Sequence, residues 1–180
     1  MNDTPTLIAF GSNIAPERHL AQGIARLQAL AGVEALSTVY RTKALPGPDT
    51  PPETRLPDFL NGALHITGSW NPWELRALLK QIEREMGRQP HQPGWAPRPL
   101  DLDIALMGSM TFHTPPLAIP DPDIADRAFL AIPLAELAPD LYHPTLRQKL
   151  TAIAARFTPR PADMIPDSAI TARLRAIIPL

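Results

Sequence analysis

The sequence predicts a single α+β domain built on an antiparallel sheet with helices on one face. Its 180 residues, 44% of them hydrophobic, suit one domain that buries a sizeable core. Apolar runs with strand and helix periodicity follow one another in the order strand, helix, strand, strand, helix, strand. The 23 prolines are concentrated at residues 46–57, 90–99, 115–122 and 159–166, and they indicate stiff loops outside these elements.

The first half of the chain supplies the first four elements. Residues 7–10 form a short apolar run that ends at Gly11, which predicts a buried strand followed by a turn. A helix is predicted over residues 16–30, because a proline opens it and leucine and isoleucine recur every three or four positions. Residues 33–42 and 63–67 are rich in β-formers and predict two strands joined across the first Pro-rich loop.

A second helix and a fourth strand complete the pattern. Apolar spacing predicts the helix over residues 73–86, with Gly87 at its end and Glu83 on its polar face. Residues 101–107 then form an apolar strand that carries two aspartates. A split βαβ repeat of this kind closes an antiparallel sheet with both helices on one face, so we expect a ferredoxin-like fold.

The last third of the chain adds helices to this sheet. Helical apolar spacing covers residues 127–137 and 145–157, and we expect both helices to cover an edge. A Pro-rich linker and a short amphipathic helix over residues 168–178 follow. We therefore predict a main domain at residues 1–158, and at residues 159–180 a linker with a short C-terminal helix that packs back or serves as a contact.

Composition narrows the class of protein. A formal net charge of -1 gives no reason to expect nucleic acid as a partner, although local basic groups can hold a small phosphate. The sequence contains no cysteine, which excludes disulfides, thiolate metal sites and thiol catalysis. Its start, MNDTPTLIAF, has neither a basic leader nor a membrane-length apolar run, so we expect no membrane partner. We predict a monomeric, cytoplasmic protein.

Residues 87–108, GRQPHQPGWAPRPLDLDIALMG, join a Pro-rich loop to the predicted strand with two carboxylates. Asp101 and Asp103 are two positions apart, so in an extended strand both side chains leave the same face. Leu102 and Ile104 then face the other side and are expected to be buried. Paired carboxylates suit Mg²⁺, which prefers oxygen ligands and keeps several waters. The pair therefore predicts a metal site.

Cationic and aromatic residues accompany the aspartate pair. Arg88 and Arg98 stand on either side of the loop, and guanidinium groups grip phosphate oxygens bidentately. Trp95 adds a flat apolar surface. The sequence contains no GxxxxGK[ST], GxGxxG or GxSxG, so nucleotide binding would depend on the aspartate pair. The alternative is a surface strand with two solvated aspartates after a Pro-rich loop.

The same stretch resembles a known family. GR followed by WAPRPLDLDI is similar to the signature GR-x-R, then W-G-P-R-x-L-D-L-D-I, of the 6-hydroxymethyl-7,8-dihydropterin pyrophosphokinases of folate biosynthesis. Similar pieces extend over residues 7–144. The resemblance implies a ferredoxin-like fold and the conversion of ATP and the dihydropterin to AMP and the pterin diphosphate. It also implies two Mg²⁺ ions held by Asp101 and Asp103, with Arg88 and Arg98 neutralising phosphate charge during catalysis.

The resemblance also assigns residues to the pterin. The segment YRT, which ends at Thr42 and is followed by Leu45, matches the family's strand end and mobile loop. In PDFLNGAL, Phe59 stands where an aromatic ring stacks on the pterin and Asn61 where an amide bonds to its edge. Phe129 would supply a second aromatic wall. The full set implied for the pterin is Thr42, Leu45, Phe59, Asn61, Trp95 and Phe129.

The nucleotide side shows two departures from the family pattern. Pro90 stands where the family has a second loop arginine, and Asp121 stands where it has a histidine. Both changes remove positive charge from the implied ATP site, which leaves open a pterin- or nucleotide-binding paralogue without catalysis. A generic ferredoxin-like oligomerisation or regulatory domain is a further alternative. The full set implied for the nucleotide is Glu83, Arg88, Trp95, Arg98, Ile104, Asp121 and Arg127.

Overall fold

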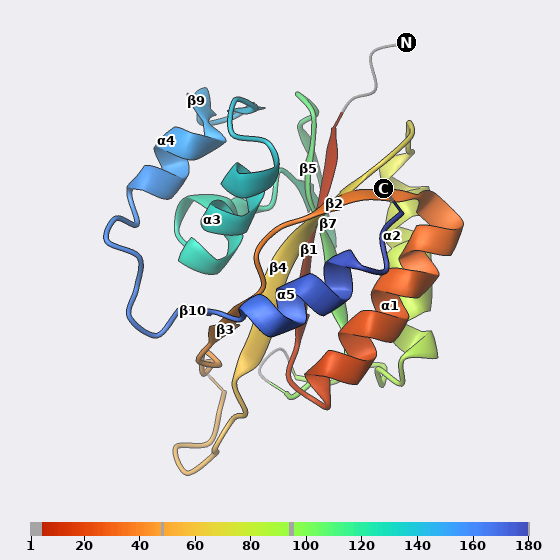
Figure 1. Cartoon of the computed structure of the whole chain (residues 1–180), viewed down its shortest axis with the longest axis vertical. Coiled ribbons are helices and arrows are strands. Elements are labelled where there is room, and N and C mark those ends of the chain that lie inside the picture. The colour runs from red at the N-terminus through yellow and green to blue at the C-terminus, as the bar shows by residue number, and fades with distance from the viewer. Residues whose placement is uncertain (1–4, 48, 94–95, 180) are drawn as a thin grey trace.

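The structure is a computed structural model that describes residues 5–47, 49–93 and 96–179 (Figure 1). Within these ranges, six strands form the main sheet: β1 (Thr6–Ser12), β2 (Val33–Leu36), β3 (Tyr40–Thr42), β4 (Phe59–Ile66), β5 (Asp101–Met107) and β10 (Ile165–Pro166). They follow the order β10-β3-β4-β1-β5, with β2 also paired to β4. All the pairings are antiparallel, so the predicted antiparallel sheet is confirmed.

Helices cover both faces of this sheet (Figure 1). One face carries α1 (Pro16–Ala31), α2 (Pro72–Glu85) and α5 (Ser168–Arg175), and the other carries α3 (Ala128–Leu137) and α4 (Leu150–Ala155). Ile8 and Phe10 of β1 join the first core, whereas Leu7 and Ala9 join the second. The first two helices share a face as predicted. The prediction that the later helices cover an edge is wrong, because both faces of β1 are apolar and both need cover.

Three element boundaries differ from the predicted ones. β4 begins at Phe59, so this aromatic residue and Asn61 lie on a strand that was expected to start later. The expected strand over residues 33–42 is split, because the Ser37 hydroxyl accepts a hydrogen bond from the Ala63 amide at 2.9 Å and replaces a backbone partner. The last predicted long helix is only α4, because β8 (Tyr142–His143) and β9 (Gln148–Lys149) form a hairpin before it.

Local sequence signals explain how α2 is positioned. The Asn71 side chain accepts hydrogen bonds from the amides of Trp73 and Glu74 at 2.9 and 3.4 Å, and Pro72 occupies the first turn. A hairpin and a short 3-10 helix connect β5 to α3: β6 (Phe112–Thr114), β7 (Leu117–Ile119) and η1 (Pro122–Ala125). No helix in the described ranges combines the length and apolar character needed to span a membrane.

The C-terminal segment folds onto the same body. β10 extends the sheet beyond β3, and α5 buries Ile170 and Leu174 in the core shared with α1 and α2. Figure 1 shows α5 lying beside α1, with the chain reaching it through β10. The predicted helix over residues 168–178 is therefore present as the shorter α5, and it packs back onto the sheet.

Candidate active site

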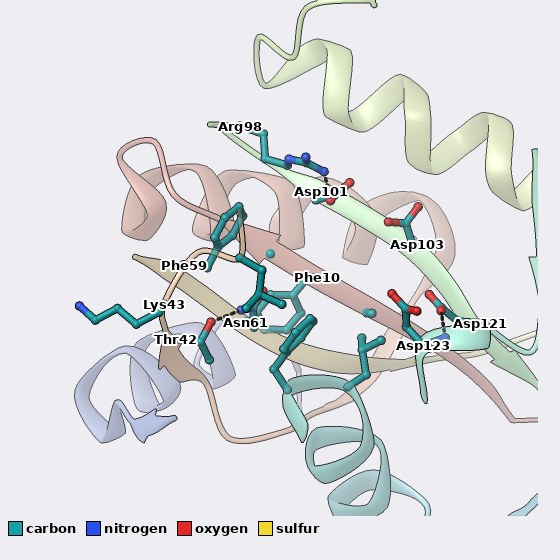
Figure 2. A pocket seen from close by; sticks show the side chains of 15 residues that line it. Phe10, Thr42, Lys43, Phe59, Asn61, Arg98, Asp101, Asp103, Asp121 and Asp123 are labelled. Atoms are coloured by element: carbon teal, nitrogen blue, oxygen red, sulfur yellow. Dashed lines mark hydrogen bonds and ion pairs between the residues drawn. The ribbon is translucent and has the colours of Figure 1, made fainter. Parts of the chain in front are cut away.

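A cavity of about 260 Å³ opens on the face of the sheet that carries α3 (Figure 2). It brings together residues from β1, β3, β4, β5 and α3 that lie far apart in the sequence. Nine of the residues predicted for the site line it: Thr42, Leu45, Phe59, Asn61, Arg98, Asp101, Asp103, Asp121 and Phe129. The structure thus joins the residues implied for the pterin to those implied for the metal and the nucleotide.

One end of the cavity is apolar and aromatic. Phe59 reaches it from the start of β4 and Phe129 from the first turn of α3, and both rings are half-buried. Phe10 of β1 also borders the cavity, but its side chain packs into the core on the opposite face of the sheet and is only 3% exposed. Rings presented by different elements can hold a flat heterocycle through stacking and apolar burial. Figure 2 shows Phe59 and Asn61 together at this end of the cavity.

An amide gives this end its hydrogen-bonding capacity. Asn61 Nδ2 donates to Thr42 Oγ1 at 2.7 Å, which orients the amide and leaves its oxygen as an acceptor. Gly11 lies against that oxygen, because a Cβ atom added at Gly11 would be 2.7 Å from Asn61 Oδ1. Thr42, Asn61 and Gly11 therefore define a polar edge beside the aromatic walls.

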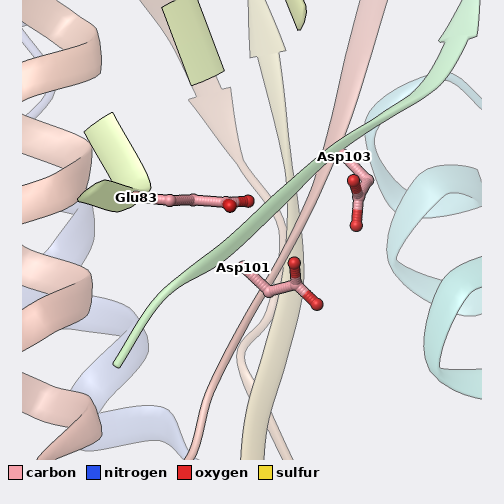
Figure 3. Close-up of side chains that lie close together, drawn as sticks. All are labelled: Glu83, Asp101 and Asp103. Carbon is pink, nitrogen blue, oxygen red and sulfur yellow. The ribbon is translucent and has the colours of Figure 1, made fainter. Parts of the chain in front are cut away.

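The other end of the cavity is acidic. Asp101 and Asp103 project from the same side of β5, and their side chains are 21% and 52% exposed. Glu83 of α2 approaches them, and one oxygen from each of the three carboxylates lies within 4.8 Å of the others (Figure 3). Leu102 and Ile104 are 1% and 4% exposed, so the predicted alternation along β5 is confirmed.

Three cations hold these carboxylates in place. Arg98 Nη1 lies 2.6 Å from Asp101 Oδ2, and Arg88 contacts both Asp101 and, at 2.8 Å, Glu83 Oε2. Lys80, which was not predicted, lies with its Nζ 2.6 Å from Glu83 Oε1 and 2.9 Å from Asp103 Oδ1. The sequence feature that could have identified Lys80 is its position three residues before Glu83, which puts both side chains on one side of the helix.

Burial and the neighbouring charges lower the pKa of Asp101 and raise the pKa values of Lys80 and Glu83. Burial by itself raises the pKa of Asp101, but the nearby Arg98 and Arg88 outweigh burial and hold it below its usual range. Burial by itself lowers the pKa of Lys80, but Asp103 and Glu83 outweigh it and raise that pKa. Asp101 is therefore ionised and Lys80 protonated at neutral pH. Burial raises the pKa of Glu83, against the opposing effect of Lys80.

The turn after β1 positions Arg98. Asn13 Oδ1 accepts a hydrogen bond from the Arg98 amide at 2.7 Å, and the Asn13 amide donates to the Arg98 carbonyl at 3.1 Å. The buried Ser12 hydroxyl donates to the Pro99 carbonyl at 2.5 Å, and Asn13 Nδ2 donates to the Pro57 carbonyl at 3.2 Å. The turn sequence alone was a weak signal, because its partners are more than forty residues away.

Cation-rich hollows adjoin the acidic cluster. One of about 400 Å³ is lined by five basic side chains, Arg76, Lys80, Arg84, Arg88 and Arg98, together with Glu83 and the loop that contains Pro90 and His91. Another of about 490 Å³ is lined by residues including Lys80, Arg88, Asp103, Ile104 and Asp121. Clustered guanidinium and ammonium groups of this kind are suited to phosphate oxygens.

Asp121 and Arg127 do not form a pair. Asp121 Oδ1 accepts a hydrogen bond from the Asp123 amide at 2.8 Å and caps η1, whereas Arg127 Nε lies 3.9 Å from Asp123 Oδ2. Burial raises the pKa of Asp121, and the negative charge of Asp103 adds to the rise. Trp95, predicted for both substrates, lies outside the described residues.

An acidic pair flanked by cations, beside an apolar cavity with a polar edge, is the arrangement of a phosphoryl-transfer site that binds a flat second substrate. The family model described as 7,8-dihydro-6-hydroxymethylpterin-pyrophosphokinase (HPPK) matches residues 7–139. The chain belongs to this family.

Similar proteins agree with this assignment. The chain is 38% identical over 141 residues to a 2-amino-4-hydroxy-6-hydroxymethyldihydropteridine pyrophosphokinase of Synechocystis, covering 77% of this chain and 68% of that protein. The protein of the same name from Bacillus subtilis is 39% identical over 133 residues, covering 72% of this chain and 75% of its own length. The protein of the same name from Aquifex aeolicus is 31% identical over 155 residues, covering 86% of this chain and 92% of its own length.

Solved structures show the same fold. The wild-type HPPK-DHPS of Plasmodium falciparum superposes with a TM-score of 0.63 at 12% identity, over 88% of this chain. The match spans 45% of that chain, so this protein corresponds to less than half of that structure.

Proposed function

We propose that this chain transfers pyrophosphate from ATP to the hydroxymethyl group of 6-hydroxymethyl-7,8-dihydropterin, giving AMP and the pterin diphosphate. One observation carries the proposal: a single cavity contains both the aromatic end at Phe59 and Phe129 and the carboxylates of Asp101 and Asp103. A pterin held at the first end would present its substituent to phosphates gathered at the second. Membership of the pyrophosphokinase family supports this reading.

The pterin is assigned to the aromatic end. Phe59 and Phe129 would cover the two faces of its ring, and Asn61, oriented by Thr42, would bond to its edge. Leu45 lines the same cavity and is 51% exposed, so a pterin that covered it would gain apolar burial.

The triphosphate is assigned to the cation-rich hollows beside α2. Arg88 and Arg98 face Asp101, and Lys80 faces Asp103, so each cation stands close to where phosphate oxygens would gather. Five basic side chains line the larger of the hollows around α2 and the following loop. They supply positive charge although Pro90 replaces one arginine of the family pattern. The assignment to ATP rests on this charge and on the family.

The acidic cluster fits a divalent cation. Its donors are hard carboxylate oxygens that converge within 4.8 Å, and half of the Asp103 side chain is open to solvent. Glu83 is 2% exposed and accepts a hydrogen bond from the Leu102 amide at 2.7 Å, so we assign it to anchoring β5 and the ions to Asp101 and Asp103. Mg²⁺, of which we propose two ions, would neutralise phosphate charge when bound.

The chain's own residues then act by positioning and charge. The hydroxymethyl oxygen forms a bond to the β-phosphorus of ATP while the bond from that phosphorus to the α-phosphate oxygen breaks, so that AMP leaves on the opposite side and the hydroxyl proton passes to solvent. Arg88 and Arg98 would neutralise charge that grows on the transferred and leaving groups, because their guanidinium groups already face the acidic end of the cavity. The bonds from Asn13 fix the backbone of Arg98 before substrate arrives, which limits the reorganisation needed to bring its guanidinium group to the phosphates.

A direct assay tests this function. Purified chain is mixed with ATP, Mg²⁺ and the dihydropterin, and AMP and pterin diphosphate are followed by chromatography and mass spectrometry. We expect both products in equal amounts, and none when the pterin is omitted. Binding of both substrates without AMP formation would instead support a non-catalytic paralogue.

Two finer assignments accompany this function. We infer that the sheet is of the ferredoxin-like type, and the order β5-β1-β4-β2, with α1 and α2 on one face, supports this. We also propose that the protein acts as a cytoplasmic monomer. Light scattering after size-exclusion chromatography would give one chain mass if this is right.

A further inference from the structure

The segment that follows the family match makes a set of contacts with β3. We call residues 165–175, which form β10 and α5, the C-terminal strap. In β10, Ile165 pairs with Arg41 and Pro166 with Tyr40 (Figure 1). The family match ends at residue 139, so it covers β3 but not the strap.

Hydrogen bonds fasten the strap to the chain just before and within β3. The Asp167 amide donates to the Val39 carbonyl at 2.8 Å, and the Val39 amide donates to Thr171 Oγ1 at 2.9 Å. Arg41 Nη2 lies 3.2 Å from Asp167 Oδ2. Asp167 Oδ1 also caps α5 by accepting from the Ile170 amide at 3.1 Å. The strap therefore binds both the backbone and a side chain of this segment.

Apart from these contacts, β3 is held by its pairing with β4 and by the Tyr40 hydroxyl, which donates to Glu136 Oε1 of α3 at 2.5 Å. The strand has three residues, and the Pro-rich loop follows it directly. A shift of one residue in the β3–β4 register would turn each side chain of β3 to the opposite face. A second hydrogen-bonded edge opposes such a shift, and the strap supplies one.

The position of β3 determines the polar edge of the cavity. Thr42 pairs with Phe59 and Tyr40 pairs with Asn61 across the β3–β4 ladder. Thr42 Oγ1 is also the acceptor that orients the Asn61 amide at 2.7 Å. A small displacement of β3 would therefore move the amide and change the aromatic wall next to it, although the strap itself does not line the cavity.

We propose that the C-terminal strap is a positioning element for the pterin end of the cavity, and that Asp167 and Thr171 are its positioning residues. The identity of the ligand rests on the proposed function. By holding β3 in register, the strap keeps Thr42 and Asn61 arranged for the heterocycle. The effect is confined to one substrate, because β10 and β5 lie at opposite edges of the sheet and the nucleotide end is built on β5 and α2.

The test uses the full chain with the double substitution Asp167→Asn and Thr171→Val. Asparagine retains the helix cap while weakening the pair with Arg41, and valine retains the shape of threonine while removing its hydroxyl. The matched control is Arg173→Ala, which removes an ion pair from the same helix, 2.7 Å from Glu17 of α1, and leaves the β3 contacts in place. All variants are compared well below their melting temperatures.

Calorimetry and steady-state kinetics give the first readout. We expect the Kd and KM for the pterin to rise about three- to tenfold in the double variant, as loss of one or two net hydrogen bonds predicts. The Kd for ATP with Mg²⁺ and kcat should stay within about twofold of wild type, a change too small to count as a lost contact. Unchanged pterin affinity, or equal losses for both substrates, would overturn the proposal.

Hydrogen exchange gives a readout that needs no ligand. The amides of residues 40–42 should exchange faster in the double variant than in the Arg173→Ala control, because opening of β3 becomes easier. Equal exchange in both proteins would refute the strap as a restraint on β3. A wild-type protein that binds no pterin would refute the proposed function, and the exchange result would still decide the role of the strap.

Discussion

The ammonium group of Lys80 lies 2.9 Å from Asp103 Oδ1 and 2.6 Å from Glu83 Oε1, which joins β5 to α2 through one cation. The same group is 3.9 Å from Asp101 Oδ1. Lys80 therefore stands where the three carboxylates converge. A divalent ion held by Asp101 and Asp103 would share this space with a protonated amine, and phosphate oxygens brought by a nucleotide would relieve the repulsion.

Lys80→Gln should separate metal binding from nucleotide binding. We expect Mn²⁺ without nucleotide to bind roughly tenfold more tightly, because a like charge next to the ion is removed. ATP should bind more weakly, because a phosphate-facing cation is lost. Free Mn²⁺ is measured by electron paramagnetic resonance and ATP by calorimetry. The control is Lys149→Gln, which breaks an exposed pair with Asp140 at 2.7 Å. Weaker Mn²⁺ binding in Lys80→Gln would show that the amine supports the ion site instead.

Replacing Asp101 should lower the stability of the folded protein, whereas replacing Asp103 should not. Asp103→Asn and Asp101→Asn should each reduce turnover about a hundredfold or more, as removal of a well-placed electrostatic group does. Asp103 is 52% exposed, so its variant should retain the wild-type melting temperature. Asp101 lies between Arg88 and Arg98, so its variant should also melt lower, because two arginines lose a charged partner. Full turnover in both variants at limiting Mg²⁺ would contradict the metal assignment.

The aromatic walls should act on the pterin more than on ATP. Phe59→Ala and Phe129→Ala are expected to weaken pterin binding by about 1–3 kcal/mol each, through lost stacking and apolar burial. Calorimetry with both ligands measures the difference. Trp73→Ala is a suitable control, because Trp73 is an exposed ring packed edge-on against Phe112 at 5.8 Å. Unchanged pterin affinity with a lower melting temperature would assign both phenylalanines to the core alone.

Asp121 offers a test of charge at the nucleotide side. Burial raises its pKa, and Asp103 adds to the rise, so an ionised Asp121 sits in an environment that disfavours negative charge. Asp121→Asn keeps a cap for η1 and removes the charge. We expect ATP with excess Mg²⁺ to bind several-fold more tightly, since a screened like-charge contact contributes on the order of 1 kcal/mol. Weaker ATP binding would identify Asp121 as a ligand that the nucleotide site needs.

Asp121→His examines the family's usual residue at the same position. A histidine can donate a hydrogen bond to phosphate where a carboxylate cannot. We expect this variant also to bind ATP more tightly than wild type. An unchanged Kd in both Asp121 variants would mean that this loop does not approach the nucleotide, and it would remove Arg127 from the residues that the family resemblance implies for ATP.

The raised pKa of Tyr40 predicts how the stability of the folded protein changes at high pH. Burial, reinforced by a hydrogen bond from its hydroxyl to Glu136 Oε1 at 2.5 Å, raises the pKa of Tyr40 to about 12. The folded state therefore keeps a proton that the unfolded state loses near pH 10, and this stabilisation disappears as pH rises from about 10 to about 12.

Urea unfolding of wild type and Tyr40→Phe at several pH values measures this effect. The stability difference between the two proteins should shrink by about 2 kcal/mol over that interval, which corresponds to a pKa rise of about two units. A difference that stays constant with pH would show that Tyr40 does not titrate in this way.

Much of the fold follows from patterns within short stretches of sequence. The spacing of apolar residues predicted α1 and α2, and the alternation of Leu102 and Ile104 with two aspartates predicted which face of β5 would carry the carboxylates. These features depend on the geometry of a single helix or strand, whose periods are 3.6 and 2 residues. Arg88 and Arg98 were predicted from their chemistry, and both lie at Asp101.

Other features arise from contacts between distant segments. Asn13 bonds to the Arg98 backbone, and Lys80 bonds to Asp103. Thr171 accepts a hydrogen bond from the Val39 amide. The members of each pair are distant in the sequence, and no local pattern specifies that they meet. The placement of α3 on the second face of the sheet was likewise decided by the need to cover both sides of β1. The sequence by itself determined the main helices and strands, apart from several of their boundaries, and the types of residue available for chemistry. Only the tertiary structure decided which of them meet, because a hydrogen bond or ion pair depends on positions in space that residues far apart in the chain acquire only when the whole sheet has assembled.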